Sequence, residues 1–111
     1  MKVILKIILV FFVATSSLST FAVQLEAKVL RTGIYGDGRL FVVLDTAIPE
    51  PGCEHPRFDV PGNHPQIDRW LSIALAAEAS QTTVKLSTKG CFGGYATMDE
   101  STDSYLYIKK G

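Results

Sequence analysis

Two cysteines and two histidines are the side chains with the widest chemistry in this chain. Cys53 and Cys91 are the only cysteines, and His55 and His64 are the only histidines. They have neither the C-x-x-C nor the H-x-x-x-H spacing of a zinc site, so we expect no metal and no other cofactor. Carboxylates lie near both histidines in the sequence, but no motif arranges a nucleophile or an acid–base pair around them. We therefore predict no catalytic residues and a protein that is not an enzyme.

The first 22 residues indicate which compartment the protein, and with it the cysteines, enters. Lys2 and Lys6 are followed by an apolar run at residues 7–14, then by small polar residues at 15–20 and a cleavage point after Ala22. This is the layout of a secretory signal peptide. The alternative, a short membrane anchor, is disfavoured because the apolar run has about 8 residues and a membrane-crossing helix needs about 20. We predict cleavage and a periplasmic or secreted protein with no later membrane span.

The remaining residues, 23–111, have the length of one domain. The leader holds two of the 11 basic residues and none of the 11 acidic ones. The remaining domain therefore has nine basic and eleven acidic residues, a net charge near −2. The only basic cluster is Lys109-Lys110 at the end of the chain. A mildly acidic domain without a basic patch is a poor match for a nucleic-acid backbone, and we expect no nucleic-acid partner.

An exported domain of this size with two cysteines is expected to join them in one disulfide. The predicted Cys53–Cys91 bond closes a loop of 38 residue steps. For a loop of that length, the chain-entropy estimate of the stabilisation is roughly 4 kcal/mol. A small domain has a total stability on the order of 5–15 kcal/mol, so this bond is expected to decide whether the domain stays folded.

Five strands are predicted over residues 24–34, 39–46, 57–60, 82–88 and 104–109. The first shows apolar alternation, and the others are apolar or β-branched runs, several of them bounded by turn residues. The second strand is apolar on both faces, which is typical of a central, covered strand. One helix is predicted between the third and fourth strands, with Asn63 as its N-cap, Gln66 completing a capping box and an end near Ser80. Its apolar face is predicted to hold residues 67, 70, 71, 74 and 75.

The resulting order, β-β-β-α-β-β, predicts a mainly β fold with one helix. In about 90 residues it matches a small five-stranded barrel of the OB type. The alternative is an open, twisted antiparallel sheet with the helix on one face. A parallel α/β fold is excluded, because it needs a helix between most strands.

The chain also resembles the short exported proteins of Gram-negative bacteria grouped with the B subunit of subtilase cytotoxin. The resemblance rests on the opening hairpin, Cys53 before Arg57-Phe58, the helix at residues 70–77, and Thr88-Lys89-Gly90-Cys91 before the closing strand. It implies an OB-type barrel and a binding role, since toxin B subunits form rings that hold cell-surface glycans. A sugar-binding serine of those toxins follows the second strand; at that point this chain has Thr46, a loose substitute.

Aromatic side chains supply the other candidate ligand-binding residues. Tyr offers a large area and a polar tip, which makes it common on recognition surfaces. Tyr105 and Tyr107 are predicted to share the outward face of the last strand while Leu106 and Ile108 point inward. Tyr35 and Tyr95 complete the candidate set, with Phe92 nearby in the sequence. Packing at the rim of the fold is the alternative role for these rings, and Trp70 is predicted to be core.

The sequence thus predicts an exported, non-enzymatic binding or interaction module, whose ligand is a glycan or another exported protein and whose assembly into an oligomer is open. Two alternatives remain: a small periplasmic enzyme or enzyme inhibitor, and a structural subunit of an envelope complex. An enzyme would need convergent polar side chains in a pocket.

Overall fold

The computed structural model describes residues 22–110. The predicted signal peptide, apart from its last residue Ala22, lies outside these residues. Within them, no helix has the length and apolar character that crossing a membrane requires.

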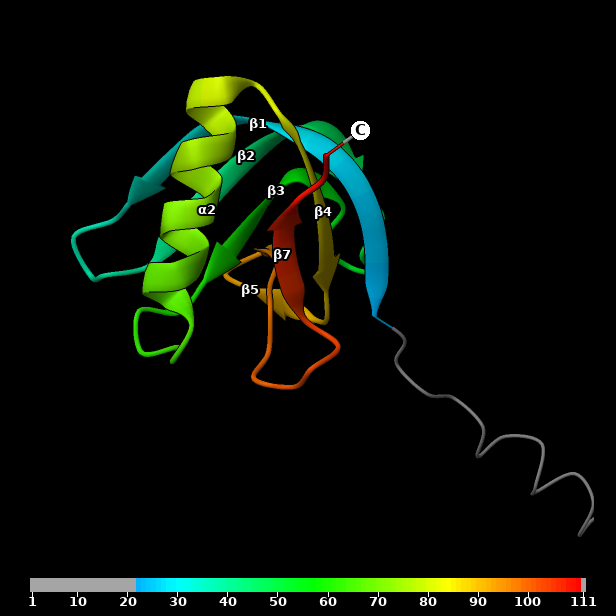
Figure 1. Ribbon diagram of the computed structural model, residues 1–111. Helices are drawn as coiled ribbons and strands as arrows, with labels where there is room; N and C mark the ends of the chain where they lie inside the picture. Colours follow the sequence, from blue (N-terminus) through cyan, green and yellow to red (C-terminus); the bar gives the residue numbers. More distant parts are fainter. Residues whose placement is uncertain (1–21, 111) are drawn as a thin grey trace, which may run out of the picture.

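The described chain is mainly β, with seven strands and one helix (Figure 1). Along the chain these are β1 (Val23–Ile34), β2 (Leu40–Ile48), β3 (His55–Val60), α2 (Ile67–Ser80), β4 (Thr83–Thr88), β5 (Cys91–Phe92), β6 (Tyr95–Ala96) and β7 (Tyr105–Ile108). All five predicted strands are present. The loop predicted around Cys91 is instead a short hairpin formed by β5 and β6.

The strands form one curled, open sheet in the order β5-β6-β3-β2-β1-β4-β7. The prediction of a closed five-stranded barrel is therefore wrong, and the alternative of an open sheet with one helix on a face is confirmed. The physical reason lies at β3. Its free edge pairs with β6 through the parallel bridge Phe58–Ala96, so the β5–β6 hairpin occupies the edge that would close a barrel.

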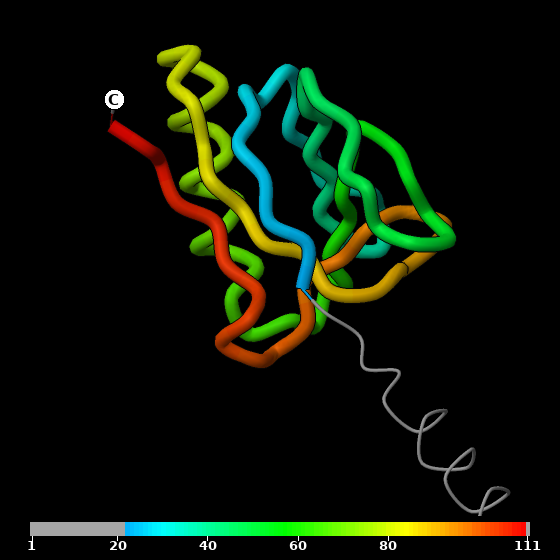
Figure 2. Tube along the Cα trace, turned by 90° about the vertical axis from the view of Figure 1, so that its right-hand side faces the viewer, coloured from blue at the N-terminus to red at the C-terminus, as the bar shows by residue number. Residues whose placement is uncertain are grey.

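The long strand β1 produces much of the curvature. Residues 23–28 pair with β4, whereas residues 29–34 pair with β2, and the register shifts between Val29 and Arg31. Such a bulge bends a strand and increases its twist. Figure 2 shows β1 passing between the two parts of the curled sheet, with α2 and β7 on the same side of the molecule.

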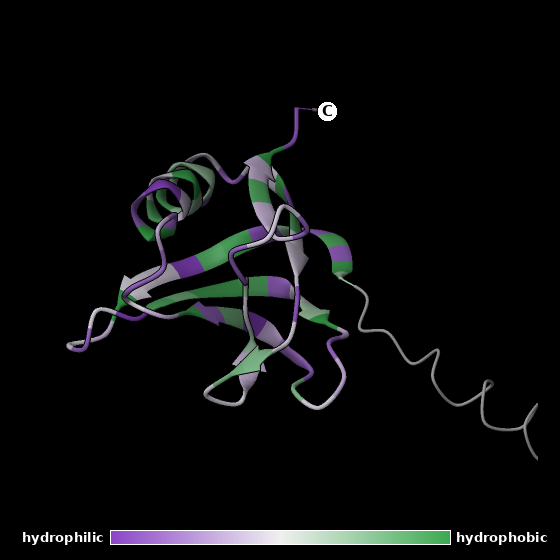
Figure 3. Cartoon of the chain, turned by 90° about the horizontal axis from the view of Figure 1, so that it is seen from below, coloured by the Kyte–Doolittle hydropathy of each residue, from purple (hydrophilic) through white to green (hydrophobic). Residues whose placement is uncertain are grey.

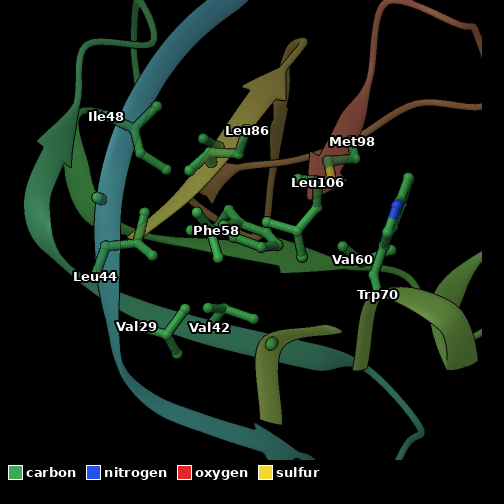
Figure 4. Close-up of a cluster of buried hydrophobic side chains, with 14 of the residues drawn as sticks. Val29, Val42, Leu44, Ile48, Phe58, Val60, Trp70, Leu86, Met98 and Leu106 are labelled. Atoms are coloured by element: carbon green, nitrogen blue, oxygen red, sulfur yellow. The ribbon is translucent and has the colours of Figure 1, made fainter. Parts of the chain in front are cut away.

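Alternation along the strands separates a buried face from an outer face. Leu40, Val42 and Leu44 of β2 are buried, and Phe58 and Val60 of β3 join them. Phe58 lies at the centre of the buried side chains drawn in Figure 4. Hydrophobic and hydrophilic residues alternate visibly along the strands in Figure 3. The intervening residues of β2 and β3 must therefore project from the outer face of the sheet.

The helix covers the inner face and contacts β1, β7 and β2. Trp70, Ala74 and Ala77 are its buried residues, and the small alanines allow close approach to the sheet. Trp70 is core, as predicted, but Leu75, predicted on the apolar face, is 48% exposed. The predicted end at Ser80 is confirmed, with Gln81 in the left-handed conformation as C-cap.

The predicted capping box at Asn63 is wrong. The helix begins at Ile67, and its N-cap position, Gln66, makes no side-chain cap bond. The ring of His64 serves instead, because its Nδ1 accepts a hydrogen bond from the Gln66 N–H at 3.0 Å. A backbone donor at the start of the helix is thereby satisfied by an imidazole rather than by an amide side chain.

Candidate functional site

The outer face of β2 and β3 carries a dense group of arginine and aromatic side chains, which we call the arginine–aromatic cluster. It comprises Tyr35, Arg39, Phe41, Arg57, Asp59, Phe92 and Tyr95. The register explains how β2 and β3 contribute: Phe41 pairs with Asp59, and Val43 pairs with Arg57. Residues two apart on one strand share a face, so Arg57 and Asp59 project together.

Asp59 is the polar centre of the cluster and is fully buried. Its carboxylate accepts hydrogen bonds from Arg57 Nε at 2.7 Å and from Arg57 Nη2 at 3.0 Å. This bidentate pairing is the strong geometry for an arginine and a carboxylate. Arg57 Nη2 also donates to the Tyr35 hydroxyl at 2.7 Å. The bonds to Asp59 and then to Tyr35 hold the pKa of Arg57 above its ordinary value, so this guanidinium is permanently charged.

Aromatic rings surround both guanidinium groups. The Arg57 Cζ lies 4.0 Å from the centre of the Tyr95 ring and 5.0 Å from that of Phe41. The Arg39 Cζ lies 4.6 Å from the Tyr35 ring centre and 5.7 Å from that of Phe92. All four distances are within the range of cation–π attraction. The rings therefore both pack around the guanidiniums and attract their charge.

The β5–β6 hairpin brings Phe92 and Tyr95 to the cluster. Its turn is Gly93-Gly94, and both glycines have positive φ, 62° and 89°. This conformation is characteristic of a two-residue hairpin turn and is open to glycine at little cost. A Cβ on Gly93 would lie 2.7 Å from Arg39 Nη1, so the guanidinium of Arg39 lies directly against the turn.

Phe41 is held in the cluster by a glycine on the neighbouring strand. Gly33 pairs with Phe41, and a Cβ at Gly33 would overlap the Phe41 ring. The ring therefore occupies the space that a side chain at Gly33 would fill, a pairing that compensates a glycine within a sheet. Tyr35 packs against the other side of this region, with its ring centre 5.0 Å from that of Phe41.

The structure divides the predicted ligand-binding residues among three places. Tyr35 and Tyr95 belong to the cluster, where both contact Arg57. Tyr105 and Tyr107 lie on β7, at the other end of the strand order from β5 and β6. Thr46 lies on β2, where the pairing with β3 is interrupted between Val43 and Ile48. These five residues do not form one site.

Tyr105 and Tyr107 form an aromatic pair of their own. Their rings are stacked with centres 5.7 Å apart, and Tyr107 is 47% exposed. Leu106 between them is buried, as the predicted alternation requires. Tyr105 also borders a cleft of about 350 Å³ between the start of α2 and the segment before β7. The cleft is further lined by Trp70, Gln66, Glu100 and Ser101, among others.

His64 lies in the wall of this cleft, and both of its ring nitrogens are engaged. Nδ1 accepts from the Gln66 N–H, so Nε2 carries the proton and donates to the Asp99 carbonyl at 2.7 Å. The ring also packs on Trp70, with centres 4.6 Å apart. His64 therefore joins the start of the helix to the loop before β7, and neither nitrogen is free to move a substrate proton. His55, at the start of β3, packs on Tyr95 instead.

Thr46 donates its hydroxyl hydrogen to Asp45 Oδ1 at 3.0 Å. The same carboxylate oxygen accepts the Lys28 N–H at 2.9 Å, and this bond is the main reason that the pKa of Asp45 lies below its ordinary value. Asp45 and Thr46 are both exposed. The pair stabilises the irregular part of β2 and makes no contact with the arginine–aromatic cluster among the described hydrogen bonds.

The predicted disulfide joins Cys53 to Cys91, with Cα atoms 6.1 Å apart. Beside it, the buried carboxylate of Glu50 accepts hydrogen bonds from the Thr88 hydroxyl and the Gly90 N–H, both at 3.1 Å. The covalent bond and these hydrogen bonds together attach the β2–β3 loop to the segment that begins the β5–β6 hairpin. They hold in place the hairpin that supplies Phe92 and Tyr95. Across residues 22–110, no group of three potential metal ligands converges.

Sequence reasoning missed Arg39, Phe41, Arg57 and Asp59. The alternation Arg57-Phe58-Asp59-Val60 contained the signal, since it places two opposite charges on one face of a strand. The aromatic residues on either side of Gly93-Gly94 were a second signal, because this dipeptide between strand-forming residues predicts a hairpin.

No family model, no curated protein and no solved structure matches this chain. The resemblance to the B subunit of subtilase cytotoxin therefore stays a prediction from the sequence.

Proposed function

We propose that this protein is an exported, non-enzymatic binding module that recognises a glycan or another exported protein through the arginine–aromatic cluster. The observation that carries the proposal is the combination of two arginines and four aromatic rings on one sheet face. Tyr and Arg are enriched among the residues that dominate binding energy at interfaces. The rings and guanidiniums are already ordered by mutual contacts, which lowers the entropy lost on binding.

Two other observations support the proposal. The Cys53–Cys91 disulfide is consistent with an oxidising compartment and therefore with export. The non-enzymatic character is supported by His64, whose two nitrogens are both bound to backbone groups. In this proposal the Tyr105–Tyr107 pair and the cleft beside it are not the primary binding face.

Site-specific photo-crosslinking in the producing cell tests the proposal for a protein ligand. A benzophenone amino acid replaces Tyr95 in one variant and the exposed Tyr107, at the other end of the sheet, in a matched control. A discrete crosslinked product from position 95 and none from position 107 is expected. The same products from both positions, or a product from position 107 alone, would place the binding face elsewhere.

A glycan array tests the proposal for a sugar ligand, with wild type, Tyr95→Ala and Tyr107→Ala compared on the same slides. Binding that is lost in Tyr95→Ala and kept in Tyr107→Ala is expected. A sizing column run on the same samples establishes whether the binding species is a monomer or an oligomer. Failure of both the array and the crosslinking contradicts the proposed function.

A further inference from the structure

We infer that the arginine–aromatic cluster binds a carboxylate from an acidic segment of a partner protein, and that Arg39 supplies the principal donors. This inference rests on the proposed binding function and specifies its ligand. It rests on two observations: the guanidinium donors of Arg39 make no hydrogen bond among the described residues, and one positive charge of the cluster has no counter-charge.

The donor count distinguishes the two arginines. Arg57 uses Nε and Nη2 on Asp59 and Tyr35. Arg39, in contrast, donates none of its guanidinium hydrogens in any hydrogen bond of residues 22–110. Its Nε lies 3.4 Å from Asp59 Oδ2, which is close enough for an ion pair, but this nitrogen is buried without a hydrogen-bond partner. A guanidinium has five N–H donors in a rigid fork, so Arg39 holds an unfilled capacity for a bidentate acceptor.

The charge count points the same way. Two guanidiniums share the single buried carboxylate of Asp59, so one positive charge at this point is uncompensated. Asp37, the nearest acidic residue along the chain, accepts the backbone N–H of Arg39, and no ion pair within the described residues joins its carboxylate to either arginine. The side chain of Arg39 is 24% exposed, so its remaining donors are within reach of a ligand.

The position of Arg39 is fixed before any ligand arrives. The guanidinium is within cation–π distance of the rings of Tyr35 and Phe92 and lies against Gly93, while Asp59 attracts its Nε. A fork held in one plane matches the planar, two-oxygen geometry of a carboxylate. These rings offer apolar surface for the methylene groups that carry an Asp or Glu carboxylate.

A polyanion fits these features less well than a protein side chain. A nucleic-acid backbone needs several basic residues in a row, and the cluster leaves one uncompensated charge. A phosphate monoester carries close to two negative charges at neutral pH, whereas a carboxylate carries one. The Arg39 guanidinium, with one uncompensated charge and aromatic rings nearby, therefore matches a single carboxylate on a peptide.

The test uses fluorescence polarisation of a labelled hexaglutamate peptide with the full mature protein at low salt. Wild type is expected to bind, Arg39→Gln to bind at least about tenfold more weakly, and Arg69→Gln, which removes an exposed arginine from α2, to bind as wild type does. Arg39→Lys keeps the charge that faces Asp59 and removes the fork, so it serves if Arg39→Gln does not fold. It is expected to lose at least about threefold in affinity.

Three results would overturn the inference. One is no polarisation change up to about 1 mM protein, a limit that corresponds to negligible affinity. Another is an equal loss in Arg39→Gln and Arg69→Gln, which would indicate general charge attraction. The third is equal or tighter binding of a labelled six-nucleotide thymidine oligomer. If hexaglutamate fails while position 95 still crosslinks a partner or Tyr95 is still needed for glycan binding, the carboxylate inference is wrong and the proposed function stands. If hexaglutamate binding, the crosslinking and the glycan array all fail, neither stands.

Discussion

Arg57 holds the carboxylate of Asp59 with two hydrogen bonds, at 2.7 and 3.0 Å, from a position two residues earlier on the same strand. Because Asp59 is fully buried, these bonds and the Arg39 ion pair replace the water that an exposed carboxylate would have. The ion pairs therefore anchor the outer face of β3 and hold both arginines beside the aromatic rings of the cluster.

Replacement of Asp59 by Asn is expected to lower the free energy of unfolding by about 3 kcal/mol, because it leaves two guanidiniums facing each other without a counter-charge. The partial exposure of both arginines places the effect at the lower end of the range for a broken buried pair. Urea denaturation followed by circular dichroism measures the change. Asp103→Asn is the matched control: Asp103 forms an exposed ion pair with Lys89, and its loss is expected to cost less than about 1 kcal/mol. Equal effects of the two variants would contradict the role assigned to Asp59.

Replacement of Gly33 by Ala tests the contact with Phe41. The added methyl group overlaps the Phe41 ring, so the ring or the backbone must shift, at an expected cost of about 1–3 kcal/mol. A double-mutant cycle with Phe41→Leu measures the coupling, since the smaller side chain leaves room for the methyl group. The double variant is expected to lose less stability than the sum of the single variants. Simple additivity would show that the two residues do not interact.

Loss of the disulfide is expected to remove roughly 4 kcal/mol of stability, on the chain-entropy estimate for a separation of 38 residues. The double variant Cys53→Ser, Cys91→Ser should therefore show a much lower urea midpoint than the oxidised wild type. Reductant should lower the midpoint of the wild type towards that of the double variant and leave the double variant unchanged. If complete reduction leaves the urea midpoint of the wild type unchanged, the disulfide does not contribute to the stability of the fold.

The loss of stability at acid pH is expected to depend on Asp99. Hydrogen bonds from Ser101, and then from Ser104, hold the pKa of Asp99 below its ordinary value in the folded protein. A carboxyl group with a lowered folded pKa stabilises the fold above its unfolded pKa and loses this contribution as the pH falls through the folded value. Unfolding free energy should therefore decrease from about pH 4 downwards. Asp99→Asn is expected to reduce this slope and to lower stability at neutral pH; an unchanged slope would contradict the assignment.

Local pattern was sufficient to predict the strands and helix but not the closure of the sheet. The alternating run of β1, the continuous apolar run of β2 and the β-branched run of β4 depend on residues close in sequence, and these strands were predicted nearly to their ends. Barrel closure depends on which distant segment pairs with the edge of β3. Here that segment is β6, whose two residues contain too few side chains to produce a periodic signal. The helix start was misplaced for a similar reason, because His64 caps it with a ring nitrogen rather than with the side chain of a common capping residue.

The candidate site was predictable only in parts. Tyr35 and Tyr95 were singled out for their residue type, yet their proximity depends on the β1–β2 turn and the β5–β6 hairpin both lying beside Arg57. Arg39, just before β2, and Arg57, on β3, were not singled out because the sequence does not show that these distant positions share one face of the sheet. The outward position of Phe41 is in fact paired with the buried charge of Asp59 on β3. A contact between an apolar and a charged residue across two strands cannot be inferred from either strand alone.

The exposed tyrosines of β7 provide the last prediction. Tyr107 is 47% exposed and Tyr105 is half-buried, and their rings stack on each other rather than in the core. The double variant Tyr105→Ala, Tyr107→Ala is therefore expected to cost less free energy of unfolding than a core truncation, since the pair contributes about 0.5–1.5 kcal/mol beyond the partial burial of the two rings. Trp70→Ala, at a core position, is expected to cost about 3–5 kcal/mol. Urea denaturation of both variants measures the difference, and a loss in the tyrosine variant as large as that in Trp70→Ala would assign these tyrosines to the core.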